Sequence, residues 1–550
     1  MRSLIKTLAA VLSMVLLFAA CTPDRGVVAP GAGTSAAPTP AGTVPIEDAD
    51  NGFLDLSTHY LITASSPLFL ETGVDYMDWM SEQILRDLNA SIYFIPVPAA
   101  DLAARNRIWI MAGDMPDITW AGFNYGDYRQ FAEQGLIRPL PANYEEMFPH
   151  LAAAMAATGF VEPLKARHDG IIYGTPKPIF MDKFVYPWGT HVGTLYYRRD
   201  WAEDLGLPVG NKLTIHEVME MAEAFMEHDP NGNGPGNTIG FAVEPPMMIW
   251  SFVAPFNPAF NRVIVDDAGQ FILGTPHEGT LQGLQTLRYY FDRGTIFRDF
   301  FTIRARGEVE AMFNAGLTGL MINGGAFGNV RRLHNLFEQA TGLNAIESIG
   351  MANITAPDGS IGSHQIANIQ SISYMNPNMS DDKFMRILAL KDHVATQEIQ
   401  DLIHMGEEGT HFEMDGDEII LTRPLTEEGD FVPMADLYPS YNLWGMLIIA
   451  WDCFTSRDPS TNPILLQRNR QLWIDRTTYG NMVMNDFDLL FYSSPAFDRL
   501  NALLTLANLG NEFTNIVLSD NVENSLEEFL RGNNPLITEA LADANANARR

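Results

Sequence analysis

The chain has 550 residues, of which 46% are hydrophobic and 11% aromatic, so it can build one large core or two. Its length predicts at least two domains. The 67 acidic residues outnumber the 35 basic ones, which form no basic tract, and the net charge is -32. Nucleic acid and anionic lipid are therefore poor partners for most of the surface. No internal repeat appears at a period of about 20 to 50 residues, which disfavours a solenoid or a propeller.

The N-terminus has the pattern of a secretory signal peptide over residues 1–20. A basic start precedes an apolar run, residues 8–20, that is too short to span a bilayer and predicts a cleaved segment. The end of this run, FAAC at 18–21, resembles a bacterial lipoprotein box, whose cysteine receives a diacylglycerol and then a further acyl chain such as palmitate. We expect Cys21 to anchor the mature chain outside the cytoplasm, at the bacterial cell membrane. The alternative is an ordinary secreted protein in which Cys21 only follows the cleavage site.

A flexible linker is predicted after the anchor. Residues 21–50 contain the lipidated cysteine and then almost only Pro, Ala, Thr, Gly, Ser and Val without apolar periodicity. About thirty such residues would let a domain move roughly 30 Å from its anchor. If Cys21 is acylated, Cys453 is the one free thiol, and its apolar neighbours predict that it is buried and inert. No later segment approaches about eighteen uninterrupted apolar residues, so we expect a body outside the membrane.

The body begins with an α/β pattern, because short β-branched or aromatic runs alternate with amphipathic ones. We predict strands over Tyr60–Ala64 and Ile92–Pro96 and helices over Tyr76–Leu88 and Leu102–Met111. The segment AGDMPDITW at 112–120 then contains Gly and Pro that predict a turn into another short strand.

Seven segments follow one another in a familiar order: MAGDMPDITW (111–120), EQGLIRPL (133–140), DGIIYGTP (169–176), TLYYRRDWAEDLGLP (194–208), DPNGNGPGNTIGF (229–241), YFDRGTIFRDFFT (290–302) and GEEGTHF (406–412). Together they resemble the family 1 extracellular solute-binding proteins of bacterial ABC importers, the carbohydrate-type lipoproteins that include oligosaccharide and alginate receptors. Each segment is weak alone, but the order over about three hundred residues is specific. A fainter likeness covers nearly the whole mature chain.

The resemblance implies an α/β, two-lobed fold of the periplasmic-binding-protein type II, whose lobes are joined by a multi-strand hinge and close on ligand. Ligands of open α/β sheets bind outside the carboxyl ends of strands, so we expect the site in a cleft between the lobes. The first crossing is expected near Leu195–Tyr197, the return near Gly350, and a third crossing between residues 380 and 400. The predicted lobe boundaries are 51–194 plus about 350–390 for lobe 1, 198–349 plus about 391–535 for lobe 2, and a tail at 536–550.

One run has the spacing of a calcium loop. Oxygen-bearing side chains at positions 1, 3, 5 and 9 and Gly at position 6 match the start of an EF-hand-type loop, with Asp229, Asn231, Asn233, Pro235 and Asn237 as expected donors. The resemblance adds that related proteins hold Ca²⁺ in such a loop. Asn237 and Gly240 stand where acids are common, so one carboxylate remains and any Ca²⁺ is expected to be structural and weakly held. The alternative is a metal-free turn after the helix that begins near Ile215.

Sugar recognition needs flat apolar faces and planar polar side chains. The candidates lie after the GDMPD turn, before the first crossing, after the calcium-like loop, after a strand at 317–322 and in a late aromatic cluster: Trp120, Asn124, Tyr125, Trp188, Trp250, Asn323, Tyr441 and Trp444. Burial in a core explains any single aromatic equally well. Gly324 and Gly325 suit either a close approach of backbone to ligand or a plain tight turn.

No catalytic residue is predicted. A glycosidase needs two carboxylates about 5 to 10 Å apart, and no acid here lies in a recognisable catalytic string. Metal-binding histidine spacing, G-x-S-x-G and a P-loop do not occur, and His404 and His411 are predicted to be surface or hydrogen-bonded structural residues.

We therefore predict a monomeric lipid-anchored receptor that captures an extracellular oligosaccharide and delivers it to ABC permease subunits, without an organic cofactor. A secreted glycosidase-type enzyme and a receptor for a non-sugar solute such as a peptide are the alternatives. The sequence does not identify the ligand, because it does not determine which aromatics face the cleft.

Overall fold

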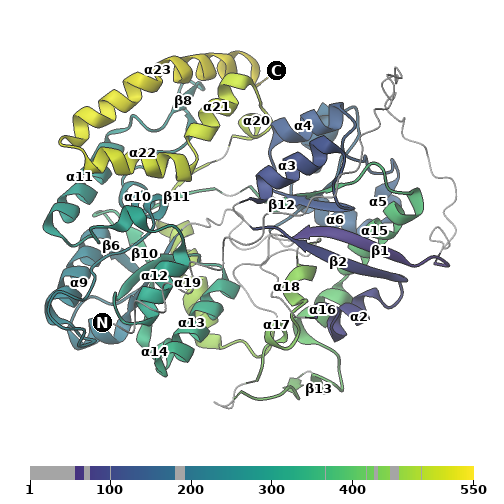
Figure 1. Cartoon of the computed structure of the whole chain (residues 1–550), viewed down its shortest axis with the longest axis horizontal. Helices are drawn as coiled ribbons and strands as arrows, with labels where there is room; N and C mark the ends of the chain where they lie inside the picture. Colours follow the sequence, from purple (N-terminus) through teal and green to yellow (C-terminus); the bar gives the residue numbers. More distant parts are fainter. Residues whose placement is uncertain are drawn as a thin grey trace, which may run out of the picture. The chain divides into compact units, whose positions relative to one another are not determined.

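The computed structural model describes residues 56–66, 75–98, 101–179, 193–365, 367–416, 418–426, 431–445, 447, 458–484 and 486–549 (Figure 1). The predictions for the signal peptide, Cys21, the linker, Trp188 and Cys453 lie outside these residues. Within them, no helix combines the length and apolarity that crossing a membrane requires.

The described residues form two separate hydrophobic cores, each built around its own sheet. We call the elements around the first core the first lobe and those around the second core the second lobe. This confirms the predicted α/β fold with two lobes.

The first lobe has a five-stranded sheet in the order β2-β1-β3-β12-β4. Strand β1 runs parallel to β2 and β3, whereas β12 is antiparallel to β3 and β4. In chain order, the lobe contains β1 (Tyr60–Ser66), α2 (Trp79–Leu85), β2 (Ala90–Pro96), α3 (Leu102–Ala112), β3 (Ile118–Ala121), α4 (Tyr125–Glu133), α5 (Tyr144–Met147), α6 (Pro149–Ala157), α7 (Val161–Arg167), β4 (Thr175–Lys177), β12 (Ser371–Met375), α15 (Asp381–Val394), α16 (Gln397–Met405), β13 (Phe412–Asp415), β14 (Glu418–Leu421), α17 (Met434–Leu437) and α18 (Tyr441–Trp444).

The predicted strands at 60–64 and 92–96 lie within β1 and β2, and the helix at 102–111 is α3. The other predicted helix, 76–88, is shorter in the structure. It begins only at Trp79, because the Asp78 side chain caps it by accepting a hydrogen bond from the Ser81 backbone N–H.

The second lobe has a four-stranded sheet in the order β6-β10-β5-β9, in which β5 is antiparallel to both β9 and β10. In chain order, the lobe contains β5 (Thr194–Arg198), α8 (Arg199–Asp204), β6 (Lys212–Thr214), α9 (Ile215–His228), α10 (Pro245–Val253), β7 (Val263–Val265), β8 (Phe271–Leu273), α11 (Glu278–Arg293), the 3-10 helix η1 (Phe300–Thr302), α12 (Arg306–Asn314), β9 (Leu320–Asn323), α13 (Phe327–Thr341), α14 (Ala345–Ser348), β10 (Ile349–Thr355), β11 (Ile361–His364), α19 (Pro463–Tyr479), β15 (Gly480–Val483), α21 (Pro495–Leu503), α22 (Leu506–Leu518) and α23 (Val522–Asn547). Helices α11, α22 and α23 lie side by side in this lobe (Figure 1).

A short helix, α20 (Phe487–Leu490), contributes to both cores. Leu489 packs against the second core, whereas Leu490 packs against the first.

Three of the predicted lobe assignments are wrong. Residues from about 350 were assigned to the first lobe, but Met351 of β10 packs in the second core. Residues 391–447 were assigned to the second lobe, but Ile399, Ile403 and Trp444 pack in the first core. The supposed tail, 536–550, instead continues α23, whose Ala540 is completely buried in the second core. In segments 391–447 and 536–550, apolar residues at helical spacing bury one face of a helix. This packing determines the lobe, in place of the boundary inferred from the family resemblance.

The crossings also differ from prediction. Leu195–Tyr197 and Gly350 lie inside β5 and β10 of the second sheet, so the chain enters that sheet before β5 and returns between β10 and β12. The third crossing does not fall between 380 and 400, because α15 and α16 both pack in the first core. The chain instead leaves the first core after Leu447 and joins the second core by Leu465.

Candidate functional site

The carboxyl end of the parallel strands in the first sheet carries an aromatic side chain. Strands β1 and β3 end at Ser66 and Ala121, and Trp120 lies at this end of β3. The Trp120 backbone N–H donates to Ser65 Oγ (3.0 Å), and its carbonyl accepts from Asn106 Nδ2 (2.6 Å). Its indole Nε1 is buried without a hydrogen-bond partner among the described residues. The strand therefore holds Trp120 in place while one strong donor stays unused.

The neighbouring candidates Asn124 and Tyr125 begin α4. The Asn124 side chain accepts from the Asp127 backbone N–H (2.9 Å), so its oxygen caps the helix. Tyr125 is only 9% exposed and meets Phe491 edge-on at 5.6 Å in the first core. Asn124 is exposed near Trp120 in the chain, whereas Tyr125 serves packing.

The late aromatic cluster belongs to the first core. Trp444 has no exposed surface, and its Nε1 donates to Ser81 Oγ (3.1 Å). A ring without exposed surface cannot stack on a sugar, so this placement corrects the predicted role of Trp444. The Tyr441 hydroxyl pairs with His404 Nδ1 (2.8 Å), and burial raises the pKa of Tyr441 to about 12. His411 likewise pairs with the Tyr438 hydroxyl (2.7 Å), as a structural histidine would.

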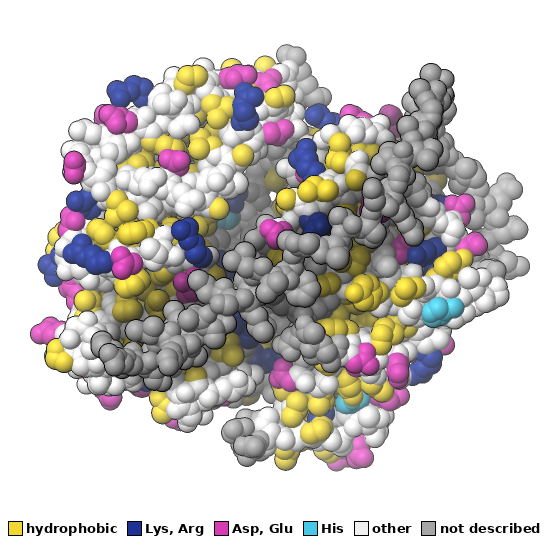
Figure 2. All heavy atoms as spheres, in the orientation of Figure 1, with side chains coloured by type: hydrophobic (Ala, Val, Ile, Leu, Met, Phe, Trp, Pro, Cys, Tyr) yellow, Lys and Arg dark blue, Asp and Glu magenta, His cyan; other side chains and the backbone are white. Residues whose placement is uncertain are grey.

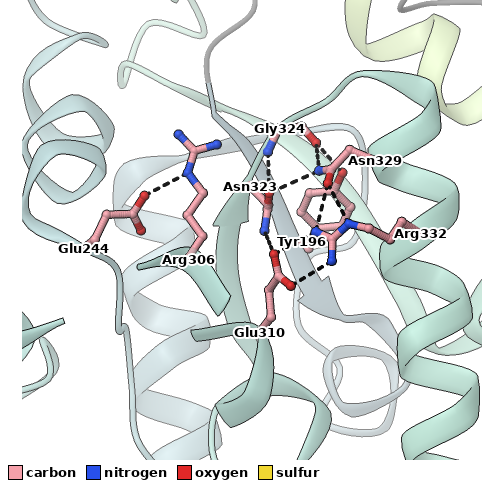
Figure 3. A network of polar contacts seen from close by, with 8 residues as sticks. All are labelled: Tyr196, Glu244, Arg306, Glu310, Asn323, Gly324, Asn329 and Arg332. Atoms are coloured by element: carbon pink, nitrogen blue, oxygen red, sulfur yellow. Dashed lines mark hydrogen bonds and ion pairs between the residues drawn. The ribbon is translucent and has the colours of Figure 1, made fainter. Parts of the chain in front are cut away.

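In the second lobe, β9 ends at Asn323, a buried residue whose side-chain nitrogen and oxygen both form hydrogen bonds (Figure 3). Its Nδ2 donates to Glu310 Oε1 (2.8 Å), and its Oδ1 accepts from the Gly324 backbone N–H (2.8 Å) and from Asn329 Nδ2 (3.1 Å). Tyr196 on β5 donates its hydroxyl to the Gly324 carbonyl (2.8 Å). These contacts hold the turn after β9 in one conformation.

An ion pair extends this network. Arg332 donates two hydrogen bonds to Glu310, at 2.9 Å to Oε2 and 2.8 Å to Oε1, and its Nη2 also donates to Asn329 Oδ1 (2.9 Å) (Figure 3). Asn329 and Arg332 are three residues apart in α13 and so share one face. Burial opposes ionisation of Glu310, but the hydrogen bonds from Arg332 and Asn323 hold its pKa below the ordinary value.

A second pair lies beside this network. Arg306 Nε donates to Glu244 Oε1 (2.9 Å), and Glu244 is 8% exposed (Figure 3). The other carboxylate oxygen, Oε2, is buried and has no hydrogen-bond partner among the described residues. Glu244 immediately precedes α10, and its carbonyl accepts from the backbone N–H groups of Met247 and Met248.

Trp250 of α10 is 7% exposed and packs edge-on against His364 with ring centroids 5.0 Å apart. It lines a small cavity together with Gly193, Asn353 and Arg476. The Arg476 guanidinium donates to Asn353 Oδ1 (2.5 Å) and Thr194 Oγ1 (3.2 Å), and burial lowers its pKa to about 10. Most of the Trp250 ring therefore belongs to the second core.

The calcium-like loop follows α9, which begins at Ile215 as predicted. Asp229 adopts a left-handed conformation (φ 47°) and accepts from the backbone N–H groups of Asn233 (3.0 Å) and Gly234 (2.7 Å) and from the Thr238 hydroxyl (2.6 Å). These hydrogen bonds, led by that of Thr238, hold the pKa of Asp229 below its ordinary value.

The candidate metal ligands in this loop are all oxygen atoms, the ligand type that Ca²⁺ prefers. The chemistry of the loop therefore suits that ion. Asp229 is its one carboxylate, and the described residues contain no group of three or more His, Cys, Asp or Glu placed to hold a metal. Asn233 Nδ2 donates to the Gly316 carbonyl (2.8 Å), and Asn237 Nδ2 donates to the Asn233 carbonyl (2.9 Å). The loop is thus shaped by its own hydrogen bonds.

Five polar or charged residues around Asn323 were not predicted from the sequence: Glu244, Arg306, Glu310, Asn329 and Arg332. A signal for Glu244 existed, because it follows the apolar run FAV at 241–243 and precedes two prolines, as a residue at a strand end would. The arginines carried no such signal, since each lies on a helix that meets the strand only in the folded chain.

Comparisons with known proteins place this fold. No family model matches the sequence. The chain is 24% identical over 248 residues to the fructooligosaccharide ABC transporter substrate-binding protein FusA of Streptococcus pneumoniae, a match covering 42% of this chain and 40% of FusA. It is 24% identical over 254 residues to the polygalacturonan/rhamnogalacturonan-binding protein YtcQ of Bacillus subtilis, covering 44% of this chain and 47% of YtcQ. The matches thus span less than half the length of these relatives.

Solved structures agree over a longer stretch. The structure of S. pneumoniae FusA in complex with kestose has a TM-score of 0.64 at 17% identity and covers 89% of this chain and 98% of FusA. An EF-hand mutant of FusA in complex with fructo-nystose has a TM-score of 0.62 at 17% identity, with the same coverage. The fold is that of the two-lobed solute-binding proteins. The family resemblance predicted from the sequence is confirmed, since FusA is named an ABC transporter substrate-binding protein and YtcQ a polygalacturonan/rhamnogalacturonan-binding protein.

Proposed function

We propose that this protein is the substrate-binding lipoprotein of an ABC importer and captures an oligosaccharide. The observation that carries the proposal is the placement of an aromatic ring at the carboxyl edge of one sheet and of a polar network at that of the other. FusA and YtcQ, named for fructooligosaccharides and for polygalacturonan and rhamnogalacturonan, support a carbohydrate as the ligand class.

The two edges have complementary chemistry for a sugar. Trp120 offers a flat face to pyranose or furanose C–H groups and an unused N–H donor. The network around Asn323 offers carboxylate and amide groups that bond to hydroxyls in fixed directions. A ligand held by both lobes favours the closed conformation because only that state makes both sets of contacts.

Two further parts of the proposal concern the membrane anchor and a structural metal ion. Acylated Cys21 would keep the receptor at a high local concentration beside the permease subunits, which recognise the closed form. A Cys21→Ser variant is expected to bind sugar in solution and to lose uptake in cells. Uptake that persists with the receptor released into the medium would contradict anchoring.

Asp229, the amide oxygens of Asn231, Asn233 and Asn237 and the carbonyl of Pro235 would hold a weakly bound, structural Ca²⁺. The FusA EF-hand mutant among the similar structures supports a loop of this kind in a relative. The ion would stabilise the C-terminal end of α9 and would take no part in oligosaccharide binding.

The direct test is calorimetric titration of the purified mature chain with a panel of oligosaccharides. We expect saturable 1:1 binding of at least one glycan and its recovery intact after incubation. Absence of binding to every glycan would contradict the proposal, and hydrolysis of a bound glycan would favour a secreted glycosidase.

A further inference from the structure

Glu244 lies near the carboxyl edge of the second sheet. An isolated parallel bridge between Ile239 and Thr318 places the run that ends at Glu244 beside the chain leading into β9, and a second, between Phe241 and Ile296, pairs the same run with the segment after α11. Glu244 lies five residues after Ile239, and Asn323 lies five residues after Thr318. Because parallel segments advance together, both side chains reach the same carboxyl edge.

The carboxylate of Glu244 is only half satisfied. Arg306 occupies Oε1 at 2.9 Å, whereas Oε2 is shielded from solvent and has no partner among the described residues. Leaving a buried, charged acceptor unpaired is costly. A partner for Oε2 must be enclosed together with it, as a ligand is when a binding protein closes.

The chemistry of that partner is restricted. A carboxylate only accepts hydrogen bonds, so the partner must donate, as a sugar hydroxyl does. A uronate would bring a second negative charge, yet both arginines drawn in Figure 3 are already paired, Arg306 with Glu244 and Arg332 with Glu310. The net charge of -32 further opposes the approach of a polyanion.

We infer that Glu244 selects neutral oligosaccharides, by accepting a hydrogen bond from a ligand hydroxyl at Oε2 and by repelling the carboxylates of uronic acids. The inference rests on the proposed function and names the substrate class of that site. The surface agrees with it, because on the face shown in Figure 2 the Lys and Arg side chains are scattered among Asp and Glu and form no basic patch.

The test is titration of the mature chain with kestose, xylotetraose, chitotetraose and maltotetraose as neutral probes and with tetragalacturonate as the acidic probe. We expect a neutral probe to bind at least 10-fold more tightly than tetragalacturonate at low salt. Glu244→Gln should weaken the binding of the best neutral probe by about 10- to 100-fold, as expected for loss of a hydrogen bond to a charged group. It should also reduce the difference in affinity between that probe and tetragalacturonate.

Glu223→Gln is the matched control, since Glu223 also pairs with an arginine, Arg293, on the same lobe (2.9 Å) but lies on α9 away from the edge. It should leave every affinity unchanged, and thermal unfolding should show that both variants fold. If tetragalacturonate binds best, or if Glu244→Gln binds the neutral probe as the parent does, the inference is wrong while the proposed function stands. If the parent binds none of the probes, both fail.

Discussion

The two lobes present the same structural edge with different chemistry. In the first lobe the carboxyl edge has the aromatic ring of Trp120, whose backbone N–H donates to Ser65 Oγ and whose carbonyl accepts from Asn106 Nδ2. In the second lobe the corresponding edge has ion pairs, of which Glu310 with Arg332 is bidentate. In the proposed function, contact with the apolar face of the ligand and selection among its polar groups are therefore divided between the two lobes.

The largest expected effect separates Trp444 from Trp120, both in the first lobe. Trp444→Ala removes a side chain with no exposed surface and should lower the free energy of unfolding by about 3 to 5 kcal/mol. Denaturant unfolding monitored by fluorescence and circular dichroism measures the loss. Trp120→Ala is the matched control and should cost much less stability. Equal losses in the two variants would contradict the assignment of one ring to the core and the other to the edge.

The first lobe also differs in burying two lysines. Lys177 donates to the Gly445 carbonyl, and Lys391 donates to the Leu447 carbonyl (2.9 Å) and to Ser373 Oγ (3.2 Å). Burial lowers the pKa of each to about 7. Because an unfolded lysine titrates near 10.4, the unfolded chain binds more protons between these values, so stability should rise with pH above about 7.

Lys391→Met should therefore raise stability at pH 7 and reduce the rise in stability between pH 7 and pH 9, to which each lysine contributes about 2 to 3 kcal/mol. Urea unfolding at pH 6, 7, 8 and 9 measures this slope. Lys165→Met, at a surface pair with Glu145, is the control and should keep the slope of the parent. A parental slope in Lys391→Met would show that the buried amine does not titrate in this range.

At the first edge, Trp120→Ala should weaken binding of the best neutral probe by about 10- to 100-fold, because it removes both a stacking face and a buried donor. Trp120→Phe keeps the face and removes the N–H, so it should recover part of the loss. Calorimetric titration measures both. If Trp120→Ala binds as the parent does, the first lobe contributes no aromatic face and the comparison between the edges fails.

The smallest expected effect concerns the second lobe alone. Millimolar Ca²⁺ should raise the melting temperature of the parent by a few degrees, since an ion at about ten times its dissociation constant adds about 1.4 kcal/mol. Asp229→Asn removes the single carboxylate of the loop and should abolish the rise. Differential scanning calorimetry with Ca²⁺ and with Mg²⁺ measures it. A rise that persists in Asp229→Asn would place the ion elsewhere.

The local elements were predictable because their signals are local. Short β-branched or aromatic runs predicted β1 and β2, and the helix beginning at Ile215 has a capping box between Thr214 and Glu217. The segment order also indicated the two-lobed fold. The lobe boundaries were not predictable in this way, since α16 and α23 show apolar faces in the sequence without showing which core they meet.

The candidate site was predicted less completely. Trp120 was predicted because it follows the GDMPD turn, and Asn323 because it follows a predicted strand. The structure puts both near strand ends, where ligands of α/β sheets bind. Trp444 was misassigned because an aromatic residue in a polar stretch can face solvent or a core. Arg306 and Arg332 were missed because their pairing with Glu244 and Glu310 brings together helices and strand ends that are distant in the chain.

The central claim is that one ligand engages both lobes and closes them. It is tested most directly by pulsed electron paramagnetic resonance between spin labels on the exposed positions Tyr93 of the first lobe and Tyr289 of the second, each replaced by cysteine in a mature chain lacking Cys21 and carrying Cys453→Ser. The account predicts a shorter mean distance and a narrower distribution with the best neutral probe at saturation. A distance distribution that saturating sugar leaves unchanged would contradict it.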